Sequence, residues 1–216
     1  MLACGMPVDL PANACVHVWP LPYEQRLEAR PLAQIDLVVI HCTELPDLAT
    51  AREYGERVLY PVSNTGNSGH YYIDNSGSDN NRNDNKGSNR DGRVHVFVRP
   101  ERIANHTRGY NPRSIGIELV NTGRYPDWLD SRHQAMNEPY TEAQIAALIT
   151  LLTTLCAELS NLHWIAGHED LDTTQVPASD DPAKTVARKR DPGPRFPWSR
   201  VLAAVPLQRM DPPAQR

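Results

Sequence analysis

Long basic runs, paired cysteines of the metal-binding kind and membrane-spanning apolar stretches are all missing from this 216-residue sequence. The formal net charge is −4 and the isoelectric point is near 6.0. Domains that mainly bind nucleic acid usually carry a basic face, so this composition argues against that class and gives no support to an anionic membrane surface as partner. No apolar stretch is long enough to span a bilayer, and no complete signal peptide is present.

The four cysteines never occur in C-x-x-C spacing, which argues against a cysteine-based zinc finger. Cys4 and Cys15 are candidates for a disulfide that their spacing alone does not establish. The residues Leu2 to Gly5 resemble the end of a bacterial lipoprotein signal. We therefore expect a lipid anchor through Cys4 if a longer precursor exists, and the alternative is a start at Met1 that happens to precede a cysteine.

Length and local composition predict one domain with irregular ends. Residues 1–30 are rich in proline and lack a sustained apolar period, so we interpret them as an extended arm, with 31–205 as the domain and 206–216 as a C-terminal tail that frays from Arg209 onward. Within the domain, residues 75–91 contain no apolar side chain. Such a segment cannot offset the entropy lost on ordering, so we expect a flexible insertion there.

Apolar periodicity predicts an α/β fold. The run at 35–41 is almost entirely apolar, as in a strand buried on both faces, whereas 114–121 alternates. A capping box at 141–144 opens the clearest helix. Together these patterns indicate a central mixed sheet of about five or six strands flanked by helices. The predicted strands are 35–41, 69–74, 93–98, 114–121 and 163–166, and the predicted helices are 47–59, 141–159 and 197–204.

Three residues have the chemistry of zinc ligands. His168 follows a short apolar strand, Asp191 closes a polar loop that we expect to be irregular, and His41 ends the buried strand, where α/β folds commonly place ligand sites. Zinc accepts imidazole nitrogen and carboxylate oxygen, and catalytic zinc usually takes three protein ligands with a further position for water. The alternative is that the histidines are structural and that Asp191 caps a turn before a proline.

Glu118 lies within an apolar strand, on the face opposite Ile115 and Ile117. A glutamate in such a place is unfavourable unless it is paired or functional. A salt bridge to Arg113 is the structural alternative. Lys189 lies between the two candidate ligands of the 163–198 stretch and is a candidate catalytic lysine.

Five motifs in one order resemble the zinc-dependent N-acetylmuramoyl-L-alanine amidases that share their fold with peptidoglycan recognition proteins and certain phage lysozyme-amidases. The motifs are VVIHCT at 38–43, GHYYID at 69–74, Asn111 with SIGIE at 114–118, AGH at 166–168 and RKRDPGP at 188–194. The resemblance implies one Zn²⁺ per chain, held by His41, His168 and Asp191, with Glu118 and Lys189 as catalytic residues. It also implies that His70, His106 and Asn111 face the substrate.

By this resemblance the substrate is peptidoglycan or a muropeptide, and the scissile bond joins N-acetylmuramic acid to L-alanine. Glu118 would accept a proton from water and Lys189 would stabilise the developing oxyanion. Two rivals remain, a binding module that does not cut and a zinc peptidase that acts on the stem peptide. The expected location is the cell envelope or periplasm, with the cytoplasm as the alternative.

Overall fold

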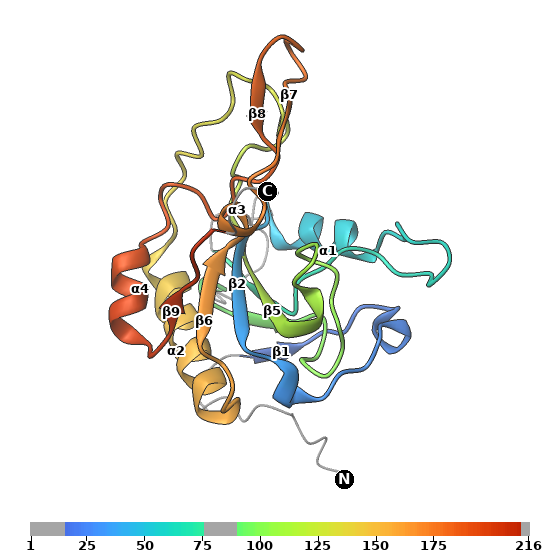
Figure 1. Cartoon of the computed structure of the whole chain (residues 1–216), viewed down its shortest axis with the longest axis vertical. Helices are drawn as coiled ribbons and strands as arrows, with labels where there is room; N and C mark the ends of the chain where they lie inside the picture. The colour runs from blue at the N-terminus through green and yellow to red at the C-terminus, as the bar shows by residue number, and fades with distance from the viewer. Residues whose placement is uncertain (1–15, 76–89, 213–216) are drawn as a thin grey trace, which may run out of the picture.

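The structure is a computed structural model that describes residues 16–75 and 90–212 (Figure 1). The candidate Cys4–Cys15 disulfide, the candidate lipid anchor at Cys4 and most of the 75–91 insertion lie outside the described residues. Among the helices of the described part, none is long and apolar enough to cross a membrane.

A mixed sheet of seven strands forms the centre of the described chain, in the order β1-β4-β3-β5-β2-β6-β9. Only β3 and β4 pair antiparallel, and the other neighbours are parallel. The mixed α/β prediction is therefore confirmed, with more strands than expected. The strands are β1 Val16–Val18, β2 Leu37–Cys42, β3 Tyr71–Ile73, β4 Val94–Val96, β5 Ser114–Leu119, β6 Trp164–Gly167 and β9 Gln208–Arg209.

The central strand β2 is buried along its whole length because both of its faces are covered. Val38 and Ile40 join the core beneath α2 and α4, whereas Leu37 and Val39 pack on the opposite face. Figure 1 shows α2 and α4 on one side of the sheet and α1 on the other. The helices are α1 Leu48–Glu56, α2 Glu142–Glu158, α3 His168–Leu171 and α4 Trp198–Ala204, with short 3-10 turns at Glu24–Arg26, Leu32–Gln34 and Asn111–Arg113.

Helix α2 begins where its sequence predicts. The Thr141 hydroxyl accepts a hydrogen bond from the Gln144 backbone N–H at 3.0 Å, and the Gln144 side-chain oxygen accepts one from the Thr141 N–H at 3.1 Å. This capping box satisfies two of the amide groups that a helix start leaves unpaired. Ile145, Leu148 and Leu152 then form a buried stripe against the sheet.

Two predictions about irregular segments were wrong. The segment between His168 and Asp191 contains α3 and an antiparallel hairpin of β7 (Gln175–Pro177) and β8 (Thr185–Ala187), which projects from the body in Figure 1. Arg209, where fraying was expected to begin, lies in β9 instead, which pairs with β6, and the Met210 N–H donates to the Ile165 carbonyl at 2.8 Å. Both segments escaped prediction because strands of two or three residues with mostly exposed side chains show no apolar alternation.

The extended arm is also part of the sheet from residue 16 onward, where β1 pairs in parallel with β4. Beyond β1, Leu21, Tyr23 and Leu27 are buried in a second apolar cluster with Leu48 of α1. These contacts hold α1 against the sheet, and α1 contributes to one wall of the site described next.

Candidate metal centre and active-site cavity

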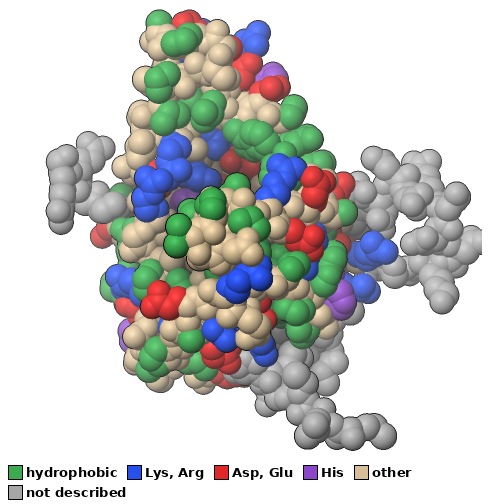
Figure 2. All heavy atoms as spheres, turned by 90° about the vertical axis from the view of Figure 1, so that its right-hand side faces the viewer, with side chains coloured by type: hydrophobic (Ala, Val, Ile, Leu, Met, Phe, Trp, Pro, Cys, Tyr) green, Lys and Arg blue, Asp and Glu red, His purple; other side chains and the backbone are tan. Residues whose placement is uncertain are grey.

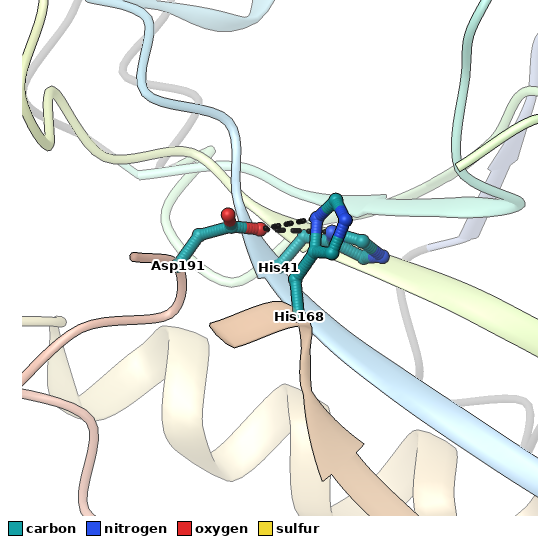
Figure 3. Close-up of side chains that lie close together, drawn as sticks. All are labelled: His41, His168 and Asp191. Carbon is teal, nitrogen blue, oxygen red and sulfur yellow. Dashed lines mark hydrogen bonds and ion pairs between the residues drawn. The ribbon is translucent and has the colours of Figure 1, made fainter. Parts of the chain in front are cut away.

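His41, His168 and Asp191 converge although they come from distant parts of the chain (Figure 3). His41 lies near the end of β2, and His168 follows β6 directly. Because β2 and β6 are parallel neighbours, their carboxyl ends meet at one edge of the sheet. Nδ1 of His41 lies 2.9 Å, and Nδ1 of His168 3.2 Å, from the same oxygen of Asp191, Oδ2.

The residues present fit a zinc ion. All three side chains are almost fully buried, and their ligand atoms lie within 4.8 Å of one another. The other carboxylate oxygen of Asp191, Oδ1, is buried and has no hydrogen-bond partner among residues 16–75 and 90–212. A buried carboxylate with an unpaired oxygen is unfavourable unless a cation completes it. Two imidazoles and one carboxylate form a donor set that zinc accepts in catalytic sites.

The protonation states also suit a metal. Burial lowers the pKa of His41 to about 4, so its imidazole is neutral near pH 7. Burial opposes ionisation of Asp191, but the electrostatics and hydrogen bonds of His168 and His41 outweigh it and hold the Asp191 pKa well below its ordinary value. Neutral imidazole and ionised carboxylate are the forms in which these groups bind metals.

Glu118 stands beside this centre on β5, opposite His41 in the β2–β5 register. It has no salt bridge to Arg113, which pairs with Asp36 instead. Burial, and next the negative charge of Asp191, raise the pKa of Glu118 well above its usual value, with Lys189 opposing the shift. A carboxyl group with a raised pKa in a cleft is a candidate for proton transfer.

A cavity of about 710 Å³ connects these groups. Glu118, Lys189 and the three candidate ligands all line it. Helix α1 and the turn after it form one wall, the 105–111 loop another, and the segment at 188–191 a third. The five residues expected to act together therefore share one cavity, which is large enough for a small ligand.

The three residues expected to face substrate have different positions. His106 and Asn111 line the cavity, whereas His70 is fully buried and does not. Nδ1 of His70 accepts a hydrogen bond from the Gly116 N–H at 3.0 Å, and its Nε2 lies 3.0 Å from the Arg102 carbonyl. The structure thus places His70 behind the wall, where it joins the strands rather than meeting a ligand.

His106 and Asn111 are already engaged within the site. The Asn111 side-chain oxygen accepts hydrogen bonds from the N–H groups of His106 (3.1 Å) and Thr107 (2.7 Å), so Asn111 shapes the 105–111 loop. Nδ1 of His106 lies 3.0 Å from Nε2 of His41. His106 is therefore in contact with the outer nitrogen of a candidate ligand, a place from which it orients that ring.

Residues 31–194 match the family model Amidase_2, which is described as N-acetylmuramoyl-L-alanine amidase. The chain belongs to this amidase family. It is an enzyme family, and the match covers all five residues of the proposed centre. No curated protein matches the sequence.

Solved structures agree on the amidase fold. AmiD from E. coli, in complex with the substrate anhydro-N-acetylmuramic acid-L-Ala-D-gamma-Glu-L-Lys, is 26% identical over 82% of this chain and 58% of its own, with a TM-score of 0.53. AmpDh3 from Pseudomonas aeruginosa, in complex with anhydromuramic pentapeptide, is 24% identical over 82% and 61%, with a TM-score of 0.55. The chain thus spans about three fifths of the length of these two proteins.

LysC from Clostridium intestinale, an N-acetylmuramoyl-L-alanine amidase, is similar over nearly its whole length. The match covers 89% of this chain and 98% of LysC, at 18% identity and a TM-score of 0.58. The predicted amidase-like α/β fold is therefore confirmed.

This amidase-family cavity also contains a buried ion pair between Glu44 and Arg124 that sequence reasoning did not predict. Nε and Nη2 of Arg124 donate to the two Glu44 carboxylate oxygens at 2.6 and 2.8 Å, and both residues are almost fully buried. Nη1 of Arg124 also donates to the Ala187 carbonyl at 2.9 Å, two residues before Lys189. The pair is therefore positioned to fix the segment that carries Lys189 and Asp191.

Removing one partner of this pair should be strongly destabilising. We expect Arg124→Met to lower the free energy of unfolding by roughly 3–5 kcal/mol, because Glu44 is left charged and buried. The double variant Glu44→Gln/Arg124→Met should recover much of that loss, since it removes the charge. Urea unfolding of the wild type, the single variant and the double variant measures the loss of unfolding free energy in each variant. Equal losses in the single and double variants would show that an unpaired Glu44 charge is not the cause.

Buried neutral histidines should make this amidase-family fold sensitive to acid. Burial, and next His17, lower the pKa of His95 to about 4, and burial with the charge of Arg30 holds the pKa of His70 well below its usual value. An unfolded histidine titrates near 6.5. Below about pH 6.5 the unfolded chain therefore binds more protons than the folded one, so stability falls as pH falls toward the folded pKa.

Each such histidine contributes a slope of up to roughly 1.4 kcal/mol per pH unit in this window. We expect the urea midpoint to drop between pH 7 and pH 5, and the slope to be smaller in His95→Gln than in the wild type. A midpoint that is constant or rises toward pH 5 would show that these rings are protonated in the folded state.

Proposed function

We propose that this chain is a zinc-dependent amidase that hydrolyses the amide bond between N-acetylmuramic acid and L-alanine in peptidoglycan or muropeptides. The observation that carries the proposal is the convergence of His41, His168 and Asp191 beside Glu118 and Lys189 in one cavity of an amidase-family fold. The substrate in complex with AmiD and the anhydromuramic pentapeptide in complex with AmpDh3 support a muropeptide as the ligand.

His41, His168 and Asp191 would hold the zinc ion. Bound there, zinc supplies Lewis acidity, which polarises a carbonyl oxygen and makes water a better nucleophile near neutral pH. His106, in contact with Nε2 of His41, would keep that ring in its orientation.

Glu118 is the proposed general base and general acid. Its raised pKa allows the carboxylate to take a proton from the attacking water and then to return it to the departing amine of L-alanine. The close approach of Gly69 positions this side chain, since a Cβ at residue 69 would lie 2.7 Å from Cγ of Glu118.

Lys189 is proposed to stabilise the developing oxyanion electrostatically. Lys189 lines the same cavity, two residues before Asp191, and its ammonium group would stabilise the negative charge that develops on the attacked carbonyl oxygen. Because Arg124 holds the carbonyl of Ala187, Lys189 begins from a fixed backbone. Orienting a charged group in advance in this way is an effective form of transition-state stabilisation.

The test is to incubate the zinc-loaded protein with a defined muropeptide and to identify the new amine terminus by mass spectrometry. Free L-alanine at the terminus supports the amidase. A new terminus within the stem peptide would instead indicate a peptidase, and binding without any product would indicate a recognition module.

A further inference from the structure

The outer nitrogen of His41 begins a series of hydrogen bonds that leads away from the candidate metal centre. Nε2 of His41 lies 3.0 Å from Nδ1 of His106, and Nε2 of His106 lies 3.1 Å from the Ser114 hydroxyl. That hydroxyl lies 2.8 Å from the Tyr110 carbonyl oxygen. The links join the end of β2, the 105–111 loop and the start of β5. We name His106, Ser114 and the Tyr110 carbonyl the polar bridge.

The direction of each hydrogen bond follows from the last link. A carbonyl oxygen can only accept, so the single proton of the Ser114 hydroxyl points to Tyr110. The Ser114 oxygen is then left to accept, and Nε2 of His106 must carry the proton that it receives. Because a neutral imidazole carries one N–H, Nδ1 of His106 is bare and faces His41 as an acceptor.

The His106 ring is neutral and closely packed. Burial, and next the charge of His41, hold the pKa of His106 well below its usual value. A Cβ at Gly116 would lie 2.7 Å from both Cγ and Nδ1 of this ring, so the glycine leaves the room that the ring occupies against β5. The Thr107 hydroxyl lies 3.0 Å from the same Nδ1 and can donate to it. Nδ1 of His106 is therefore an acceptor held in one place.

His41 meets an acceptor on each side of its ring. Its Nε2 faces Nδ1 of His106 at 3.0 Å, and its Nδ1 faces Oδ2 of Asp191 at 2.9 Å. The neutral ring has a single proton and can donate to only one of them. At the other contact two lone pairs meet, which is unfavourable in a buried site. A metal ion held by Nδ1 and Asp191 removes this conflict, because the proton can then stay on Nε2 and serve His106.

From these contacts we infer that the polar bridge keeps the proton of His41 on Nε2, which turns the Nδ1 lone pair toward the metal, and that Ser114 is a positioning residue for zinc. Ser114 is fully buried and does not line the cavity, which opens as a hollow bordered by Lys and Arg side chains in Figure 2. The inference rests on the proposed function, because it assumes the zinc ion at His41, but it concerns the binding of that ion and not the cleavage of the substrate.

The first test is the zinc dissociation constant, measured by competition with a chelator for the wild type, Ser114→Ala, His106→Phe and the double variant. Loss of an outer-shell partner of a metal ligand typically weakens metal binding by about 10- to 100-fold. We expect about tenfold for Ser114→Ala, which leaves Nε2 of His106 without its acceptor. The loss should be nearer to about 100-fold for His106→Phe, which removes the acceptor of His41 itself.

The double variant distinguishes a positioning role from a merely structural one. If Ser114 acts through His106, Ser114→Ala should add nothing in the His106→Phe background, so these two proteins should bind zinc equally. Ser68→Ala is the matched control, because Ser68 is also a buried, hydrogen-bonded serine but lies outside the polar bridge. It should bind zinc as the wild type does. Unchanged affinity in Ser114→Ala, or a further loss in the double variant, would overturn the inference.

A second measurement, on the zinc-loaded wild type, does not depend on how the variants fold. In protein labelled with a magnetic nitrogen isotope, NMR should detect a slowly exchanging N–H at Nε2 of His41 and a nitrogen–nitrogen coupling across the hydrogen bond to Nδ1 of His106. An N–H that exchanges freely and shows no coupling would overturn the inference.

The two proposals fail in different ways. If the zinc-loaded protein shows this coupling but never cleaves a muropeptide, the polar bridge stands and the amidase proposal fails. If the muropeptide is cleaved while Ser114→Ala binds zinc as tightly as the wild type, the amidase proposal stands and the polar bridge fails.

Discussion

Glu118→Gln is expected to lower kcat for muropeptide cleavage by roughly 10²- to 10⁴-fold, the usual contribution of a positioned general acid or base. Glutamine keeps the shape of the side chain but cannot take the proton of the attacking water. The metal ligands are not altered, so zinc content and the urea midpoint should stay near the wild-type values. Steady-state kinetics with zinc analysis measures all three quantities.

The matched control for this change is Glu28→Gln, which removes the same charge from an exposed glutamate outside the cavity. It should leave kcat within about twofold, since surface changes of this kind have small effects. An active Glu118→Gln protein would remove Glu118 from the chemistry. A protein that had lost its zinc as well would mean that Glu118 supports the metal centre instead.

Gly69→Ala should reproduce part of the Glu118 effect without touching the carboxyl group. The added Cβ would lie 2.7 Å from Cγ of Glu118 and 3.2 Å from the Gly116 carbonyl, so the Glu118 side chain must move. We expect kcat to fall at least about tenfold, because catalytic groups misplaced by about 1 Å lose much of their effect. Wild-type kcat in this variant would show that the site tolerates the shift.

Asp191→Ala is expected to have the largest effect on the metal. The change removes the carboxylate that both histidines contact, and it leaves two imidazoles as the candidate ligands. Loss of an outer-shell partner alone typically weakens zinc binding by about 10- to 100-fold, so loss of a ligand should weaken it by at least about 100-fold. Zinc analysis after dialysis should find the metal absent, and muropeptide cleavage should be lost with it.

Asp127→Ala is a suitable control for that experiment, because Asp127 is half exposed and its partner is His133. It should retain zinc and activity. Full zinc occupancy in Asp191→Ala would place the metal elsewhere, and it would also leave the unpaired Oδ1 of Asp191 without its explanation.

The two histidines of the candidate metal centre could be placed from the sequence because their signals are local. His41 ends a long apolar strand, and His168 follows a short one, so ordinary rules for parallel sheets place both at one edge. Asp191 and Lys189 were candidates from their residue types, but their place beside His41 needed the family resemblance, because no local rule brings position 191 back to position 41. Helix α2 could also be predicted from the sequence, since its capping box and its apolar stripe lie within one segment.

Other features depend on contacts between distant residues and gave no such signal. Glu44 and Arg124 are 80 positions apart, and charged residues are expected at the surface unless a partner is known. His70 belongs to the GHYYID motif that resembles the family. Only the structure shows that its ring accepts a hydrogen bond from the Gly116 N–H behind the cavity wall. The hairpin β7–β8 bears few buried side chains, so its sequence shows no strand period.

The most direct test of the central claim is a zinc titration of the metal-free protein, with cleavage of a defined muropeptide followed by mass spectrometry. We expect no cleavage without zinc, a linear rise with added metal, a plateau at one zinc per chain, and a product that begins with L-alanine. Cleavage by the metal-free protein, or an intact muropeptide at full zinc occupancy, would show that the protein is not a zinc-dependent amidase of this kind.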